Sequence, residues 1–285
     1  MSVRKVTELL HAQPASDGDG VKLLRVFGGR GPERFDPFLM LDEFGSYEAS
    51  DYIGGFPPHP HRGFETVTYM LEGKMEHQDH MGNIGLLNDG DVQWMTAAGG
   101  VIHSEMPKQT EGRMRGFQLW VNLPADKKMA PAQYADVPSR EIPVFEREGL
   151  RIKAIAGEAL VNHEPVKGRF TDVATQPTYL DVHISAGQSL TLPVGLTHTA
   201  LVYVYEGQVC IGDAETPVHH QQLARLTDGN QVSLLNNAQS EARALILVAE
   251  PLREPIVQYG PFVMNSMAEI ERAMADYRNG TFVSA

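Results

Sequence analysis

The chain has 285 residues, of which 42% are hydrophobic and 21% charged, so it can bury a sizeable core and is globular rather than disordered. Its 36 acidic and 24 basic residues give a net charge of −12, which excludes a nonspecific nucleic-acid binder because such proteins need a basic surface. The single cysteine, Cys210, excludes an intramolecular disulfide and a thiolate zinc cluster, and suits a reducing compartment. No segment resembles a signal peptide or the roughly 20-residue apolar run of a membrane span. We therefore expect a cytoplasmic protein that does not bind nucleic acid or a membrane directly.

Short segments rich in β-branched and aromatic residues recur along the chain and predict an all-β fold. Turn signals such as Glu72-Gly73 and Glu206-Gly207 separate them. Many short strands punctuated in this way are typical of β-sandwiches and barrels. The clearest predicted strands are 66–71, 116–122, 179–184, 200–206 and 244–249.

One helix is predicted near the C-terminus. Ser266 and Glu269 form a capping-box pattern, apolar residues follow at helical spacing, and Gly280 is the expected stop. A shorter helix is expected to start after Pro124, but prolines interrupt the stretch that follows, which also suits a domain boundary. We predict an N-terminal domain over 1–130 and a C-terminal domain over 131–285 that ends in the helix.

The two halves of the chain resemble each other. Residues 67–75 read VTYMLEGKM and residues 201–209 read LVYVYEGQV, which predicts two stacked β-barrels of the same type. At this alignment the second half has a proline and a glycine in place of His59 and His61. His198 remains there without a close partner, so a site built on the histidine pair is expected in the first half only.

Two pairs of polar residues have the i, i+2 spacing that places side chains on one face of a strand. His59 and His61 form one pair, and His103 and Glu105 form the other. If the two strands are neighbours, three imidazoles and a carboxylate converge, which suits a divalent first-row metal and leaves about two coordination positions open. An isolated H-x-H is more often a solvated pair in a polar loop, but the second pair favours a metal site.

Other polar residues near this site are expected to have lesser roles. His77 and His80 are interpreted as solvated histidines of a turn, with hydrogen bonding to the ligands as the alternative. Glu65 is a base, a residue that orients a ligand, or the partner of an arginine. Trp94 and Trp120 are expected in the core or in the wall of a pocket.

These residues, with their spacing, resemble the motifs of a known family. His59, His61 and Glu65 followed by Gly73 are similar to the first cupin motif, and the region 90–105 is similar to the second. The detail resembles the pirins, which have two cupin barrels, and the resemblance extends over essentially the full length. The stretches that carry it are DPFLMLDEF (36–44), FPPHPHRGFETVTYMLEG (56–73), GDVQWMTAAGGVIHSEMP (90–107), QLWVNLP (118–124) and YGPFVMN (259–265).

The resemblance implies two antiparallel cupin barrels joined by a short linker, with one metal in the N-terminal barrel and none in the C-terminal barrel. The residues that match the ligands are His59, His61, His103 and Glu105, and the metal is expected to be iron(II), with other first-row metals as alternatives. Bacterial pirins are often similar to quercetin 2,3-dioxygenases, which open a flavonol ring with O₂. Glu105 would then be both a ligand and the acceptor of the substrate's proton, and Phe56 would line the pocket mouth.

Two other functions remain open at this stage. Some pirins resemble regulators that sense a metal or its redox state and bind a protein partner, and an oxidisable metal with open positions suits such a role. A cupin with a purely structural metal is the third reading. The dioxygenase is the preferred hypothesis, with a small aromatic, flavonol-like substrate and O₂ as its partners.

Overall fold

A computed structural model describes residues 2–28 and 35–283, and within these ranges the chain forms two compact units. The histidine barrel comprises the described residues of 13–28, 38–139 and 252–283. The apolar barrel comprises those of 2–12, 35–37 and 140–251. The sequence suggested one boundary between residues 130 and 131, whereas each unit also includes a terminal segment from the other end of the chain.

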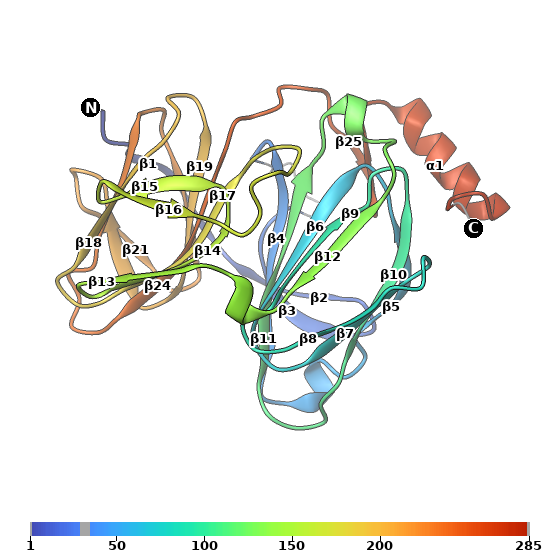
Figure 1. Cartoon of the computed structure of the whole chain (residues 1–285), viewed down its shortest axis with the longest axis horizontal. Coiled ribbons are helices and arrows are strands. Elements are labelled where there is room, and N and C mark those ends of the chain that lie inside the picture. Colours follow the sequence, from blue (N-terminus) through green and yellow to red (C-terminus); the bar gives the residue numbers. More distant parts are fainter. Residues whose placement is uncertain (1, 29–34, 284–285) are drawn as a thin grey trace. The chain divides into compact units, whose positions relative to one another are not determined.

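The histidine barrel consists of a seven-stranded and a four-stranded antiparallel sheet (Figure 1). The larger sheet has the spatial order β12 (Gln133–Val137), β9 (Val92–Thr96), β6 (Phe64–Glu72), β11 (Met114–Asn122), β4 (Phe38–Ser46), β3 (Val21–Phe27) and β2 (Gln13–Asp17). The smaller has the order β5 (Phe56–His61), β10 (Val101–Pro107), β7 (Met75–Asp79) and β8 (Ile84–Leu87).

The apolar barrel repeats this arrangement. Its larger sheet has the order β1 (Val6–His11), β22 (Gln222–Leu226), β19 (Thr199–Glu206), β24 (Ala242–Ala249), β17 (Thr178–Ile184), β14 (Leu150–Ala156) and β13 (Val144–Arg147). Its smaller sheet has the order β18 (Ser189–Pro193), β23 (Gln231–Leu235), β20 (Gln208–Ile211) and β21 (Thr216–His219), and β15 (Glu158–Val161) pairs with β16 (Glu164–Lys167).

The two barrels therefore have matching strand orders, as expected from the repeat in the sequence. The repeated segments 67–75 and 201–209 begin in β6 and β19, the third strand of each larger sheet. All five strands predicted from the sequence are present, so the predicted all-β fold with two barrels and a C-terminal helix is confirmed.

The C-terminal segment adds a short hairpin and the helix to the histidine barrel. The hairpin consists of β25 (Val257–Tyr259) and β26 (Phe262–Met264), and α1 (Met267–Asn279) follows it (Figure 1). Ser266 caps α1 by accepting a hydrogen bond from the Glu269 backbone N–H, and Gly280 ends it in the left-handed conformation, as the sequence predicted. Among the described residues, no helix has the length and apolar character needed to cross a membrane.

Short 3₁₀ turns complete the fold. They are η1 (Ala49–Asp51), η2 (Ala125–Lys127) and η3 (Ser139–Glu141). The helix expected after Pro124 is only the single turn η2, because Pro131 follows within the next few residues and removes a backbone donor.

Arg62 ties α1 to the histidine barrel. Its guanidinium donates to the carbonyl oxygens of Gly99 and Phe282, at 2.7 and 3.0 Å, and to a carboxylate oxygen of Asp276 at 2.7 Å. Buried Ile270 and Ala273 of α1 pack in a cluster with Phe262, Met264 and Phe282. The C-terminal segment belongs to the histidine barrel because of these long-range contacts, which no local sequence pattern predicts.

Candidate metal centre

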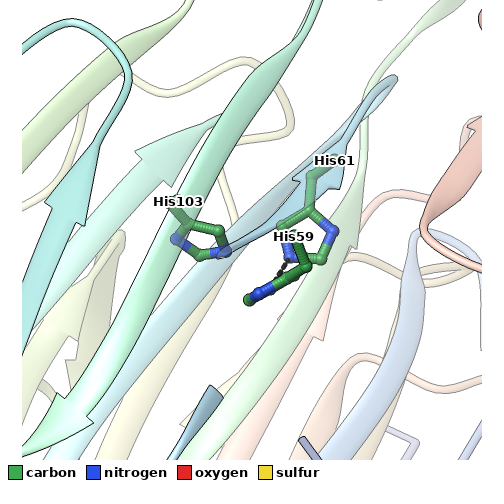
Figure 2. A group of neighbouring side chains, drawn as sticks. All are labelled: His59, His61 and His103. Atoms are coloured by element: carbon green, nitrogen blue, oxygen red, sulfur yellow. Dashed lines mark hydrogen bonds between the residues drawn. The ribbon is translucent and has the colours of Figure 1, made fainter. Parts of the chain in front are cut away.

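The three predicted histidines are positioned by two neighbouring strands of the smaller sheet. β5 pairs antiparallel with β10, with His59 opposite His103 and His61 opposite Val101. His59 and His61 share one face of β5 because they are two residues apart. The ring centroids of His103 lie 4.4 Å from those of His59 and 4.8 Å from those of His61, and Figure 2 shows the three rings converging.

The Nε2 atoms of the three rings are the atoms available to a metal. His59 Nδ1 lies 2.8 Å from the Pro57 carbonyl oxygen, so it must donate there, and Nε2 of the neutral ring keeps its lone pair. His59 Nε2 lies 2.9 Å from His61 Nε2, and His103 Nε2 is buried without a hydrogen-bond partner among the described residues. Two nitrogens that bind one metal at right angles, each about 2.1 Å from it, would lie about 3.0 Å apart. The distance between the Nε2 atoms of His59 and His61 therefore fits a metal that takes the place of the proton between them.

His77 supports the cluster from behind. It lies on β7, is fully buried, and its Nε2 is 2.7 Å from His103 Nδ1. If His103 binds a metal through Nε2, its Nδ1 carries the hydrogen and donates it to His77, which fixes the tautomer and the ring orientation. The expectation that His77 is a solvated turn residue is therefore wrong. The strict alternation from buried Met75 through Glu76 to His77 was the signal that places it inside.

The electrostatics of the cluster favour neutral imidazoles, which is the form that binds metals. Burial is the largest cause that lowers the pKa values of His61 and His103, and the positive charge of a neighbouring histidine adds to it. Burial also lowers the pKa of His77 to about 4. At neutral pH the rings of His61, His103 and His77 are therefore neutral, and each carries a lone pair for a metal or a hydrogen bond.

Glu105 lies in the same barrel, but among the residues that the structure describes, the group of potential ligand atoms within 4.8 Å of one another consists of the three histidines alone. The carboxylate is buried, with Gln118 Nε2 donating to Oε1 at 3.3 Å and Thr68 Oγ1 at 3.1 Å from the same oxygen. Burial raises the pKa of Glu105, opposed by the charge of His59. Its role as a fourth ligand stays a prediction.

The remaining sequence candidates lie elsewhere. His80 sits at the turn after β7, where its Nδ1 accepts from the backbone N–H of Ile102 at 3.3 Å. Glu65 is buried on the opposite face of β6 from Thr68, and its Oε1 accepts from Thr96 at 2.6 Å. Neither residue lines the cavity in front of the histidines.

A cavity of about 850 Å³ opens in front of His59 and His61. This volume is in the range of small-molecule sites. Trp120 and Phe56 contribute aromatic walls, and Glu105, Thr68 and Gln118 contribute polar groups. Trp120 and Phe64 also pack against the His61 ring, with centroids at 5.3 and 5.1 Å, and shield it from water. The expectation that Phe56 lines the pocket is confirmed.

The apolar barrel has no equivalent cluster among its described residues. Its strands β18 and β23 occupy the positions that β5 and β10 occupy in the histidine barrel. Their inward residues are Leu190, Leu192, Val232 and Leu234, all buried in one apolar core. Packed leucine and valine side chains leave neither ligands nor space for a metal there.

A barrel of this topology with convergent imidazoles facing an open cavity defines the cupin class. The family model described as Pirin matches residues 20–121, and the Pirin C-terminal cupin domain matches residues 179–283. A Pseudomonas aeruginosa protein with the name "Putative quercetin 2,3-dioxygenase" is 54% identical over 97% of this chain and 97% of its own. The chain belongs to the pirin family.

Two solved structures show the same fold. The crystal structure of a quercetin 2,3-dioxygenase from Acinetobacter baumannii is 36% identical, with a TM-score of 0.88 over 99% of both chains. A bacterial pirin from Escherichia coli in complex with nickel(II) is 18% identical, with a TM-score of 0.64 over 86% of this chain and 98% of its own. At that identity the second likeness concerns the fold alone.

Proposed function

We propose that this protein is a metal-dependent dioxygenase of the quercetin 2,3-dioxygenase type, which opens a flavonol ring with O₂. The observation that carries the proposal is the three-imidazole cluster beside a cavity of about 850 Å³ that has both aromatic and polar walls. The names of the relatives and the structural likeness to a quercetin 2,3-dioxygenase support it. In this proposal His59, His61, His103 and Glu105 hold one divalent metal, expected to be iron(II).

The residues fit such a metal because an orphaned buried nitrogen, His103 Nε2, faces two others that lie 2.9 Å apart. A bound metal would supply Lewis acidity toward the chelating oxygens of a flavonol and an electron path to O₂. The Escherichia coli pirin was solved in complex with nickel(II), which supports keeping other first-row metals as alternatives to iron(II). Imidazole nitrogens bind either ion, so the ligand set does not choose between them.

The chain itself would supply the proton acceptor. Substrate chelation requires loss of the flavonol 3-hydroxyl proton, and Glu105 is a buried carboxylate that lines the cavity together with His59 and His61. A carboxylate within hydrogen-bond reach of the substrate's hydroxyl can accept its proton, and Glu105 occupies such a position in the cavity. Since Thr68 and Gln118 both approach Oε1, we assign the proton to Oε2. Trp120 and Phe64 would keep bulk water away from the reacting centre.

Anaerobic reconstitution with Fe(II), followed by addition of quercetin and O₂, tests this function. The expected result is metal-dependent loss of the flavonol absorbance with release of carbon monoxide, and much slower turnover in Glu105→Gln. The Gln variant keeps the shape of the side chain and removes the base. One metal per chain without any turnover would refute the dioxygenase and favour the alternative, a metal- or redox-sensing regulator that binds a protein partner.

A further inference from the structure

A row of polar side chains crosses the inner face of the seven-stranded sheet in the histidine barrel. Directly opposed residues of antiparallel strands project to the same face, so residues in register form a continuous line. One such line runs through every strand of this sheet and contains a polar residue at each position. Its members are Asp136, Gln93, Thr68, Gln118, Asp42, Arg25 and Gln13.

The central part of this row forms a wall of the cavity. Thr68, Gln118, Asp42 and Arg25 all line it. Thr68 and Gln118 reach Glu105 at one end, and Arg25 and Asp42 lie at the other. Adjacent strands are about 4.8 Å apart, so roughly 10 Å separates Gln118 from Arg25.

Apolar rows flank the polar row on both sides. Met40 and Trp120 are in register two residues away on one side, and Leu23 and Phe44 are in register two residues away on the other. All four line the cavity. A flat aromatic ligand can therefore bind with its two faces against the apolar side chains and with one edge in contact with the polar row.

The end of the row that is remote from Glu105 has a defined charge. Arg25 forms a bidentate pair with Asp42, through Nε at 2.9 Å and Nη2 at 2.8 Å, and Nη2 also contacts Asp17 at 3.1 Å. Asp42 is 3% exposed. Asp19, two residues after Asp17 in the sequence, also lines the cavity. Asp42 and Asp17 both contact the single Arg25, and Asp19 is a third aspartate in the cavity lining, so this end is rich in acceptors and net negative.

This charge balance selects among ligand groups. A carboxylate has about four acceptor positions, and Arg25 uses two of those on Asp42, which leaves positions for hydroxyl hydrogens. A carboxylate on the ligand would face the surplus negative charge, and a bare ring would leave the acceptors unpaired. Hydroxyl groups satisfy both conditions.

We propose that the Arg25–Asp42 pair is the specificity-determining element of this cavity, which selects flat phenols that carry ring hydroxyls at the end remote from the histidines and rejects those with a carboxylate there. This inference rests on the proposed function for the orientation of the ligand, with its chelating oxygens at the histidines. It goes further because it assigns the distal contacts to residues that are not part of the metal cluster.

Binding of three flavonols to Ni(II)-loaded protein under nitrogen tests the inference without turnover. The probes are quercetin, 3-hydroxyflavone, which keeps the chelating oxygens but lacks the other hydroxyls, and 3-hydroxyflavone with a 4′-carboxylate. Quenching of tryptophan fluorescence reports the affinity. A hydrogen bond to a charged acceptor contributes enough that we expect quercetin to bind about 10-fold or more tightly than 3-hydroxyflavone, and the carboxylate to bind weakest.

The variant to compare is the double substitution Arg25→Met with Asp42→Leu. Replacing both partners of a buried pair by apolar side chains avoids leaving one charge uncompensated, so the barrel is expected to fold. The preference for quercetin over 3-hydroxyflavone should fall to about 2-fold or less, with unchanged Ni(II) stoichiometry. Arg113→Met is the matched control, because Arg113 pairs with Glu72 outside the cavity. Asp42→Asn is the second variant. It keeps the shape of the side chain but removes the charge of the acceptor, so it should also lower the preference for quercetin.

The outcomes separate the inference from the proposed function. Equal affinity for quercetin and 3-hydroxyflavone in the wild type, or a preference that survives the double substitution, would overturn the inference even if quercetin is turned over. A preference that depends on Arg25 and Asp42 would support it even if no carbon monoxide is ever released.

Discussion

Removing the hydrogen-bond partner of His103 should weaken metal binding. In His77→Phe the aromatic ring keeps most of the buried volume, but nothing replaces the Nε2 atom that lies 2.7 Å from His103 Nδ1. When His103 binds a metal through Nε2, its Nδ1–H would then be buried without an acceptor. That costs about 1–3 kcal/mol, or a roughly 5- to 150-fold weaker metal affinity. Loss of outer hydrogen bonds to metal ligands typically weakens affinity by about 10- to 100-fold.

The affinity can be measured by competition between the protein and a chelator for Ni(II), with the metal-free proteins compared by thermal unfolding. His80→Phe is the matched control, since His80 contacts only the backbone of Ile102 among the hydrogen bonds described for it. We expect the control to stay within about 2-fold of the wild type. A His77→Phe affinity equally close to wild type would refute the supporting role of His77 and the tautomer assigned to His103.

Three further predictions concern the metal ligands and the helix. His61→Ala should lose the metal while the apolar barrel keeps its own core, so full metal content by elemental analysis would contradict the ligand assignment. His198→Ala should leave the metal-to-chain ratio unchanged, and a lower ratio would reveal a site in the apolar barrel. Arg62→Ala should lower the free energy of unfolding in urea by about 2–4 kcal/mol, because it removes a buried guanidinium with three partners. The Asp276 side chain is 30% exposed, so Asp276→Asn should lower the free energy of unfolding by less than about 1 kcal/mol. Equal losses in Arg62→Ala and Asp276→Asn would contradict burial of the guanidinium as the cause of the larger effect.

Local patterns in the sequence were sufficient for the strands, the helix and the histidine pairs. Alternation of polarity located the strands, and the Ser266–Glu269 pair located the start of α1. The i, i+2 spacing brought His59 and His61 to one face because the pleat of a strand allows no other result. The same rule places His77 inside, because it lies two residues after buried Met75 on the same strand.

The polar row could not be predicted in the same way. Arg25 and Gln118 lie far apart in the sequence and meet Asp42 only through the registers of β3 and β11 with β4. Register between distant strands depends on the packing of the whole barrel rather than on a local pattern. The assignment of the terminal segments to the barrels was missed for the same reason, since β1 is held by β22.

The rim of the cavity includes residues 258–261, which come from the C-terminal segment rather than from the barrel strands that carry the histidines. During synthesis the ribosome makes these residues long after His103, so the nascent chain has its imidazoles well before it can enclose them. Metal and ligand would thus meet an unfinished, more open site until residues 258–261 have been made. Fragments that stop before residue 252 would carry all three histidines but lack this part of the cavity wall.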